Sequence, residues 1–208
     1  MFITINKNYV SEITIKKSRF IASLFYVEKE EEANKLINLI NKKYYDAKHN
    51  CFAYRIYDNG NIKERFSDNG EPSGTAGQPI LNVLKGKNLQ NVLVIVTRYF
   101  GGILLGTGGL VKAYTEVTQK VLEDIKIIKK EIGKIVKLEI KYNDLENLNY
   151  YLRQNNIKIH KIDYLENVEI YLEITNEQFE NFENTQNEFN FNILKKEIVN
   201  SNEFVIVE

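Results

Sequence analysis

The segment from Val92 to Val121 constrains the fold most, because it predicts a buried strand, a glycine loop and a helix in direct succession. Val92–Thr97 is a continuous apolar, β-branched run, typical of a central strand that is covered on both faces. We expect Gly108 or Gly109 to open the helix. Its apolar stripe would be Leu110, Ala113, Tyr114, Val117 and Val121. A loop of this kind can present backbone N–H groups and a positive helix end to an anion.

A second glycine-rich turn lies upstream of this segment. Nine of the eleven glycines and both prolines fall between Gly70 and Gly109. The loop from Asp68 to Gly77 leads into a helix that we expect to reach about Lys85. Capping at Gly77 would place Pro79 in the first turn, where its missing N–H costs nothing. Before the loop, we expect strands at 51–57 and 62–66, joined by the Asp58-Asn59-Gly60-Asn61 hairpin turn.

The remaining elements divide the chain in two. We expect β-structure over 13–27, with a turn at Lys17–Ser18, and a helix over 28–44. From about Lys129 the pattern becomes β-α-β-β-α-β, the ferredoxin-like order. Its elements are expected at 136–142, 144–156, 157–164, 168–174, 176–189 and 204–207. The sequence therefore predicts an α+β protein with domains at 1–130 and 131–208.

Composition limits the class of protein. The 28 basic and 28 acidic residues balance, but residues 1–128 hold 18 Lys and Arg against 13 Asp and Glu, a net of +5, and the remainder holds 10 against 15, a net of −5. This asymmetry is too mild to establish a nucleic-acid site, for which a domain pI above about 9 is more persuasive. The single cysteine, the lack of a signal pattern and the shortness of every apolar run favour a soluble cytoplasmic protein without a membrane anchor.

The first candidate site is an anion-binding surface that could contact a nucleic acid. It combines the glycine loop with nearby basic and aromatic side chains: Arg55, Arg98, Tyr99, Gly101, Gly102, Gly106, Gly108, Gly109 and Lys112. The loop is not a P-loop, because Thr107 and not Lys follows Gly106. Two alternatives stay open. The glycines could serve only close strand–helix packing, and Arg98 could pair with Asp68 or Glu71.

The second candidate is the loop before the first glycine-flanked helix, together with the preceding strand. Its residues are His49, Asp68, Gly70, Glu71, Pro72, Ser73, Gly74 and Thr75. Two carboxylates three residues apart could hold a metal or act as acid and base, but too few further ligands lie nearby for a metal. The alternative is a turn whose side chains cap backbone groups. Cys51 beside His49 could be a nucleophile, yet His49 precedes the expected strand and a free cysteine is usually a buried apolar residue.

Three separated motifs resemble the IMPACT/YigZ family: A-K-H-N-C-F-A-Y-R-I (47–56), S-D-N-G-E-P-S-G-T-A-G-Q-P-I-L (67–81) and V-T-R-Y-F-G-G-I-L-L-G-T-G-G-L-V-K-A-Y (96–114). The acidic C-terminal part is similar to the additional domain of bacterial YigZ-type members. Asn69 departs from the family pattern, in which a second Asp is frequent, and this weakens a two-aspartate metal site. The resemblance implies an N-terminal domain like the second domain of ribosomal protein S5 and a ferredoxin-like C-terminal domain. The pair is similar to domains four and five of elongation factor G.

The resemblance also implies a role in translation, because eukaryotic relatives regulate it. We therefore expect a non-enzymatic regulatory protein that contacts the ribosome, RNA or a translation-related protein, with no cofactor, no metal and no DNA sequence specificity. One alternative is an enzyme acting on a small anionic substrate in a cleft between Asp68 and Lys112. Another is a protein-interaction module, which predicts an apolar patch on the exposed sheet face at 168–174 or 135–140.

Overall fold

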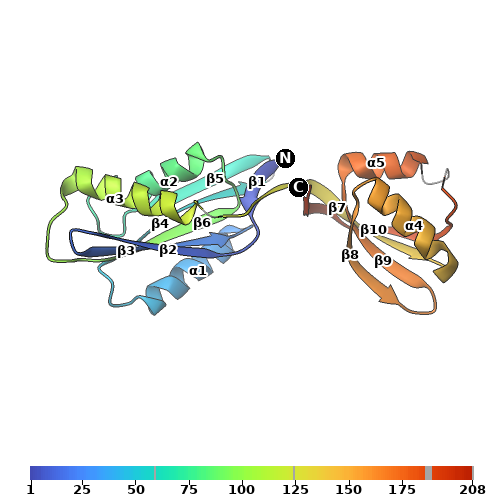
Figure 1. Cartoon of the computed structure of the whole chain (residues 1–208), viewed down its shortest axis with the longest axis horizontal. Helices are drawn as coiled ribbons and strands as arrows, with labels where there is room; N and C mark the ends of the chain where they lie inside the picture. The colour runs from blue at the N-terminus through green and yellow to red at the C-terminus, as the bar shows by residue number, and fades with distance from the viewer. Residues whose placement is uncertain (59, 124, 186–188, 208) are drawn as a thin grey trace. The chain divides into compact units, whose positions relative to one another are not determined.

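The computed structural model describes residues 1–58, 60–123, 125–185 and 189–207. The chain divides into two compact units, which we call the N-terminal unit (Phe2–Ile128) and the C-terminal unit (Lys129–Glu208, with Met1). Figure 1 labels the helices and strands of both. Each unit is α+β, and each has a sheet and a hydrophobic core of its own.

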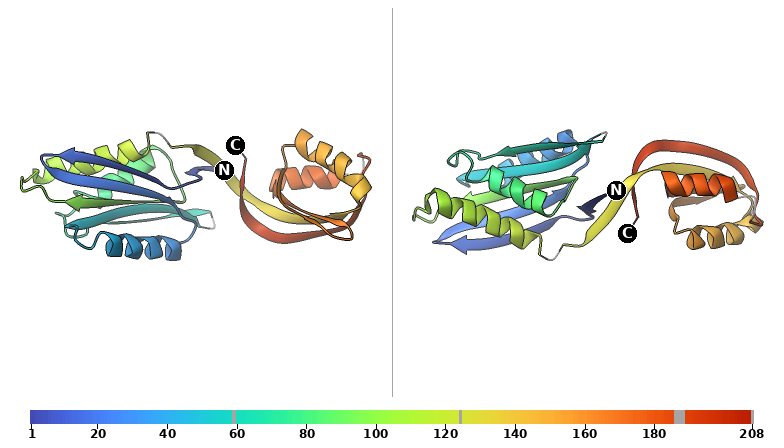
Figure 2. Two further views of the ribbon diagram at one scale, coloured as in Figure 1. Left: turned by 60° about the horizontal axis from the view of Figure 1, so that its bottom comes forward. Right: turned by 90° about the horizontal axis from the view of Figure 1, so that it is seen from above.

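The N-terminal unit is built on an antiparallel sheet of order β2-β3-β6-β4-β5. Its elements in chain order are β1 (Phe2–Ile5), β2 (Tyr9–Ile15), β3 (Ser18–Tyr26), α1 (Glu30–Lys43), β4 (His49–Asp58), β5 (Asn61–Ser67), α2 (Gly77–Gly86), β6 (Val92–Tyr99) and α3 (Gly106–Val121). Figure 2 shows α1 on one face of this sheet and α2 and α3 on the other.

Strand β6 lies at the centre of this sheet, as its apolar run predicts. Its alternate side chains enter different cores, because successive residues of a strand point to opposite faces. Val94 and Val96 pack in the core that includes α2 and α3. Leu93 and Ile95 pack in the core that includes α1. The strand is therefore buried on both faces over its whole apolar length.

Several elements differ from the sequence-based expectation. Helix α3 begins at Gly106, before either expected start, and His49 is the first residue of β4 and not a residue ahead of it. The turn before β3 is formed by Lys16 and Lys17, both with positive φ, one residue earlier than expected. The short β1 was not expected. In the turn before β5, Asn59 lies outside the described residues, while Asp58 pairs with Asn61.

The C-terminal unit contains the predicted β-α-β-β-α-β order of elements. These are β7 (Ile127–Ile140), a 3₁₀ turn (Tyr142–Asp144), α4 (Leu145–Gln154), β8 (Lys158–Tyr164), β9 (Val168–Thr175), α5 (Asn176–Thr185) and β10 (Ile193–Ile206). β7 pairs with β9 and β10, and β8 pairs with β9, all antiparallel. β10 begins eleven residues before the expected last strand. The expected end of α5 falls partly on 186–188, outside the described residues.

One face of this sheet is covered and the other carries charges. Val168, Ile170, Leu172 and Ile174 are buried in the core with α4 and α5 side chains. The intervening residues of β9 form a polar surface, on which Lys137 Nζ lies 2.8 Å from Glu169 Oε1 and also contacts the ring of Tyr171. The apolar patch that a docking role predicts for this sheet is therefore replaced by paired charges along β9. Among the described residues, no helix is both long and apolar enough to cross a membrane.

Candidate functional site

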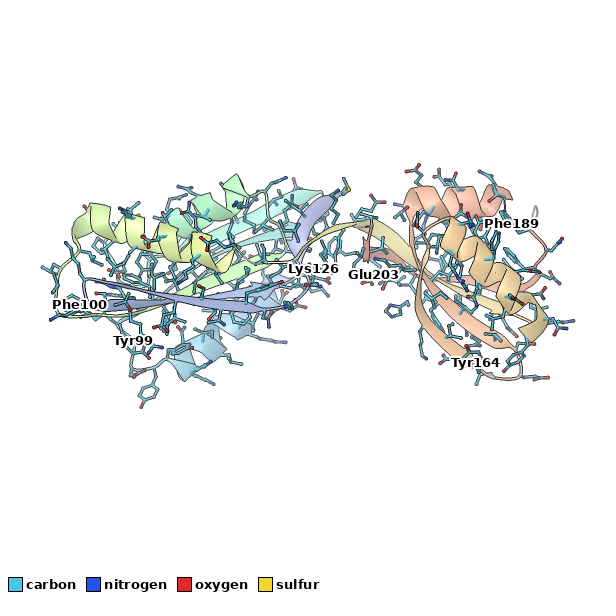
Figure 3. The ribbon with its side chains drawn as sticks, in the orientation of Figure 1. Tyr99, Phe100, Lys126, Tyr164, Phe189 and Glu203 are labelled. Carbon is cyan, nitrogen blue, oxygen red and sulfur yellow. The ribbon has the colours of Figure 1, made fainter. Side chains whose placement is uncertain are left out.

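Residues from all three family-like motifs line one cavity of about 350 Å³ in the N-terminal unit. They come from the start of β4, the loop before α2, the end of β6 and the start of α3. The lining residues are Lys48, His49, Glu71, Pro72, Arg98, Phe100, Leu104, Leu105, Gly106, Thr107 and Leu110. Figure 3 labels Phe100 at the loop that leads into α3. We call this space the motif cavity.

Strand register brings the first and third motif segments together. His49 of β4 pairs directly with Arg98 of β6, and the Lys48 N–H donates to the Arg98 carbonyl oxygen at 3.0 Å. The loop after β6 is fixed against the β2–β3 turn, where the Gly101 N–H donates to Ser18 Oγ at 3.2 Å. A Cβ at Gly101 would lie 2.0 Å from the backbone carbon of Lys17, so glycine is needed here for close packing.

The floor of the motif cavity contains a buried ion pair. Arg98 Nη1 donates to Glu71 Oε1 at 2.6 Å, and the two side chains are only 6% and 3% exposed. The Tyr114 hydroxyl donates to the same carboxylate oxygen at 2.9 Å. The guanidinium carbon also lies 5.4 Å from the ring centroid of Phe20 and 5.6 Å from that of Phe100. Arg98 therefore makes the internal pairing with Glu71 that the sequence left open.

Cys51 belongs to the same buried network. Its Sγ donates to the carbonyl oxygen of Asp68 at 2.9 Å and contacts the Tyr114 hydroxyl at 3.3 Å. Burial raises the pKa of the Cys51 thiol to about 12, and burial likewise raises the pKa of Tyr114. A thiol with such a pKa remains protonated at neutral pH, which makes it a weak nucleophile.

His49 is oriented by the loop before α2. Its Nδ1 lies 2.8 Å from the carbonyl oxygen of Asn69, and because a carbonyl only accepts, Nδ1 is assigned the hydrogen. In the neutral ring Nε2 then carries the lone pair, and it lies 3.8 Å from Glu71 Oε2. Asn69 has a φ of 43°, and its side-chain oxygen accepts the Asn50 N–H. The residue that departs from the family pattern thus has a structural role here.

The loop itself is a cap for α2. Asp68 Oδ1 accepts the N–H groups of Ala76 and Gly77, and Oδ2 accepts that of Gly74. Thr75 Oγ1 donates to the carbonyl oxygen of Pro72 at 2.7 Å. The bond to Gly77 satisfies an N–H group that the helix start leaves free, and the other contacts fix the residues just before the helix. The contacts of Asp68 and Thr75 match the capping alternative for this loop. Within the loop, Gly70 and Gly74 have positive φ, and Ser73 is exposed.

The other residues of the predicted anion surface are more dispersed. Arg55 lies near the opposite end of β4, where it pairs with Glu64 and donates to the Leu89 carbonyl oxygen. The Tyr99 hydroxyl donates to Asp46. Lys112 is exposed on α3 and does not line the motif cavity, whereas Gly106 does. Gly108 and Gly109 lie in the first turn of α3, and Gly102, with positive φ, lies in the loop before it.

Sequence reasoning missed the apolar wall of the motif cavity and the exposed Lys48 beside it. Phe100, Leu104, Leu105 and Leu110 supply this wall, and Leu104 is 82% exposed. Three consecutive apolar residues in a glycine-rich loop were the available signal, because loops of this type are usually polar. Among the described residues, no group of three or more His, Cys, Asp and Glu side chains could hold a metal.

The fold and this cavity define a two-unit α+β protein with a small, partly apolar cavity in its N-terminal unit. The model of the Impact N-terminal domain matches residues 16–122, and a domain of unknown function (DUF1949) matches 138–188. The chain therefore belongs to the IMPACT family, as its three motifs predicted.

Individual relatives agree with this assignment. IMPACT family member YvyE of Bacillus subtilis is 41% identical over 168 residues, which cover 81% of this chain and 77% of that protein. IMPACT family member YigZ of Escherichia coli is 38% identical over 151 residues, covering 72% and 74%. A structure described as that of a hypothetical protein has a TM-score of 0.63 at 29% identity, covering 93% of this chain and 97% of that one.

Proposed function

We propose that this protein is a non-enzymatic, translation-associated regulator that binds the ribosome or its RNA through the motif-cavity end of the N-terminal unit. Family membership supports a role in translation, because the eukaryotic relatives regulate translation. The proposal rests on one observation. Glu71 at the floor of the motif cavity accepts hydrogen bonds from Arg98 and Tyr114, while the rim exposes Lys48 and Leu104. Such an arrangement favours binding over bond-making chemistry.

We further propose fold names for the two units as domains, with the boundary near residue 130. The N-terminal sheet with helices on both faces is compatible with a domain like the second domain of ribosomal protein S5. The strand order β10-β7-β9-β8 supports a ferredoxin-like C-terminal domain. Folds of this kind host many functions, so the names alone assign none.

A catalytic role has weaker support. Asp68, one of the two candidate bases, accepts three backbone N–H groups, and Glu71, the other, is paired with Arg98 and Tyr114. A general base must be able to reach a substrate proton. A docking role for the C-terminal sheet is also less favoured, because charged residues along β9 occupy its open face.

Co-sedimentation with purified ribosomes at low salt tests the proposal. Lys48 and Lys112 are both exposed, so replacing both with Glu should abolish binding without disturbing the core. The matched control replaces two exposed lysines of α1, Lys35 and Lys42, with Glu. Phosphate binding also predicts a salt dependence whose slope falls by about one for each phosphate that a variant no longer neutralises. Equal binding by both double variants, or no binding by the native protein, would contradict the proposal.

A further inference from the structure

We infer that the motif cavity is a binding site for an apolar carboxylate, meaning a carboxylate carried by an aliphatic or aromatic group. A free organic acid and the C-terminal residue of a peptide share this chemistry. The inference goes beyond the proposed function, because it concerns a ligand inside the cavity and does not require contact with the ribosome.

The apolar part of the ligand is indicated by the walls. Phe100, Leu104, Leu105 and Leu110 surround the space together with Pro72. A volume of about 350 Å³ lies at the small end of ligand pockets, which run from about 300 to 1,000 Å³. The exposure of Leu104 at the rim leaves apolar surface in water that a bound ligand would cover.

The negative charge of the ligand is indicated by three cationic features. Arg98 lines the cavity, is only 5% exposed, and has an Nε with no hydrogen-bond partner among the described residues. Its Nη2 has only a long contact of 3.5 Å with Ser18 Oγ. A buried guanidinium satisfied at one nitrogen retains unmet hydrogen-bonding capacity.

Lys48 and the start of α3 add to this charge. Lys48 is exposed and lines the cavity. Gly106 and Thr107, the first two residues of α3, also line it, and no acidic residue lies in that first turn. A helix start carries free N–H groups and a partial positive charge. The lining also contains one carboxylate, that of Glu71, which offsets the charge of Arg98 but not that of Lys48 or of the helix start.

Calorimetric titration of the full-length protein with matched probes tests this inference. Phenylbutyrate should bind, phenylbutanol should bind about tenfold more weakly because it lacks the charge, and acetate should not bind at the same concentration because it lacks the apolar group. Two tetrapeptides ending in Leu, one with a free and one with an amidated C-terminus, distinguish the sources. Preference for the free peptide over phenylbutyrate identifies a peptide end, and the reverse identifies a free acid.

Variants place the binding in the cavity. Leu104→Asp puts a negative charge at the rim and should weaken phenylbutyrate binding at least about tenfold. Leu39→Asp changes an exposed leucine of α1 and serves as the matched control. Equal affinity for phenylbutyrate and phenylbutanol, equal effects of the two variants, or no binding of any probe would overturn the inference. Because no ribosome is present, failure here is distinct from failure of the proposed function.

Discussion

At the residue scale, the motif cavity contains a buried ion pair between Glu71 and Arg98. Both side chains are nearly inaccessible to water. Removing one member leaves the other charge unpaired in the interior, so Arg98→Met should lower the free energy of unfolding by about 3–5 kcal/mol. Combining it with Glu71→Gln should recover part of this loss. Urea denaturation provides the measurement.

The control for this prediction is an exposed ion pair. Arg19 and Glu12 form a bridge whose side chains are both largely in water. Arg19→Met should therefore change stability little, because solvent screens such pairs. A similar loss of stability in Arg19→Met and Arg98→Met would show that burial does not set the strength of the Glu71–Arg98 pair.

A second residue-scale prediction concerns the reactivity of Cys51. With a pKa of about 12, about one thiol in ten thousand is ionised at pH 8. The native protein should react with iodoacetamide far more slowly than the protein in urea, as followed by mass spectrometry. Val10→Cys, at an exposed position of β2, provides a fast-reacting reference within the same chain. Comparable native rates at the two cysteines would contradict the assigned pKa.

The raised pKa of Cys51 also determines how its contribution to stability changes with pH. The folded state holds the thiol proton more tightly than the unfolded chain does. Its contribution to stability is therefore complete below the ordinary thiol pKa of 9.0 and is lost as the pH rises towards about 12. It gives no loss of stability in acid.

At the scale of elements, the start of α2 depends on a side chain nine residues before it. Asp68→Ala removes the acceptor of three N–H groups. We expect a loss of about 1–2 kcal/mol and faster amide exchange over 74–80, measured by hydrogen–deuterium exchange. Asp46→Ala, which removes an exposed acceptor from Tyr99, should leave those amides unchanged. Protection over 74–80 that survives Asp68→Ala would show that other contacts hold the helix start.

The sequence predicted elements with strong periodicity and missed those without it. The β-branched run of β6 identified a central strand, and the glycine turns identified two helices, although α3 begins at Gly106, before the expected start. β10 was expected too late because its first part, 193–201, is largely exposed and mixes Lys, Glu and Asn with apolar residues. The motif cavity could not be derived, because it depends on the pairing of His49 with Arg98 and on a loop packed against Lys17. Neither of these two interactions has a local signature.

At the scale of the whole molecule, the separate cores predict separate responses to mutation. Leu172 is buried among side chains of the C-terminal unit, and Leu84 belongs to a core of the N-terminal unit. Truncating either leucine to alanine should cost about 2–5 kcal/mol. Hydrogen exchange should show a loss of amide protection only in the unit that carries the substitution. Loss of protection in both units from either single change would indicate that the chain unfolds as one cooperative body.

The strand order of the N-terminal sheet also has a consequence for synthesis on the ribosome. The last residue of β3, Tyr26, and the last residue of β6, Tyr99, are 73 residues apart, yet their strands are neighbours. At a synthesis rate of about 5–20 residues per second, roughly 4–15 s pass between the completion of β3 and the completion of β6. Until then, the β2–β3 and β4–β5 hairpins exist without the strand that joins them. Arg98 arrives with that strand, so the motif cavity is among the last features of this unit to form.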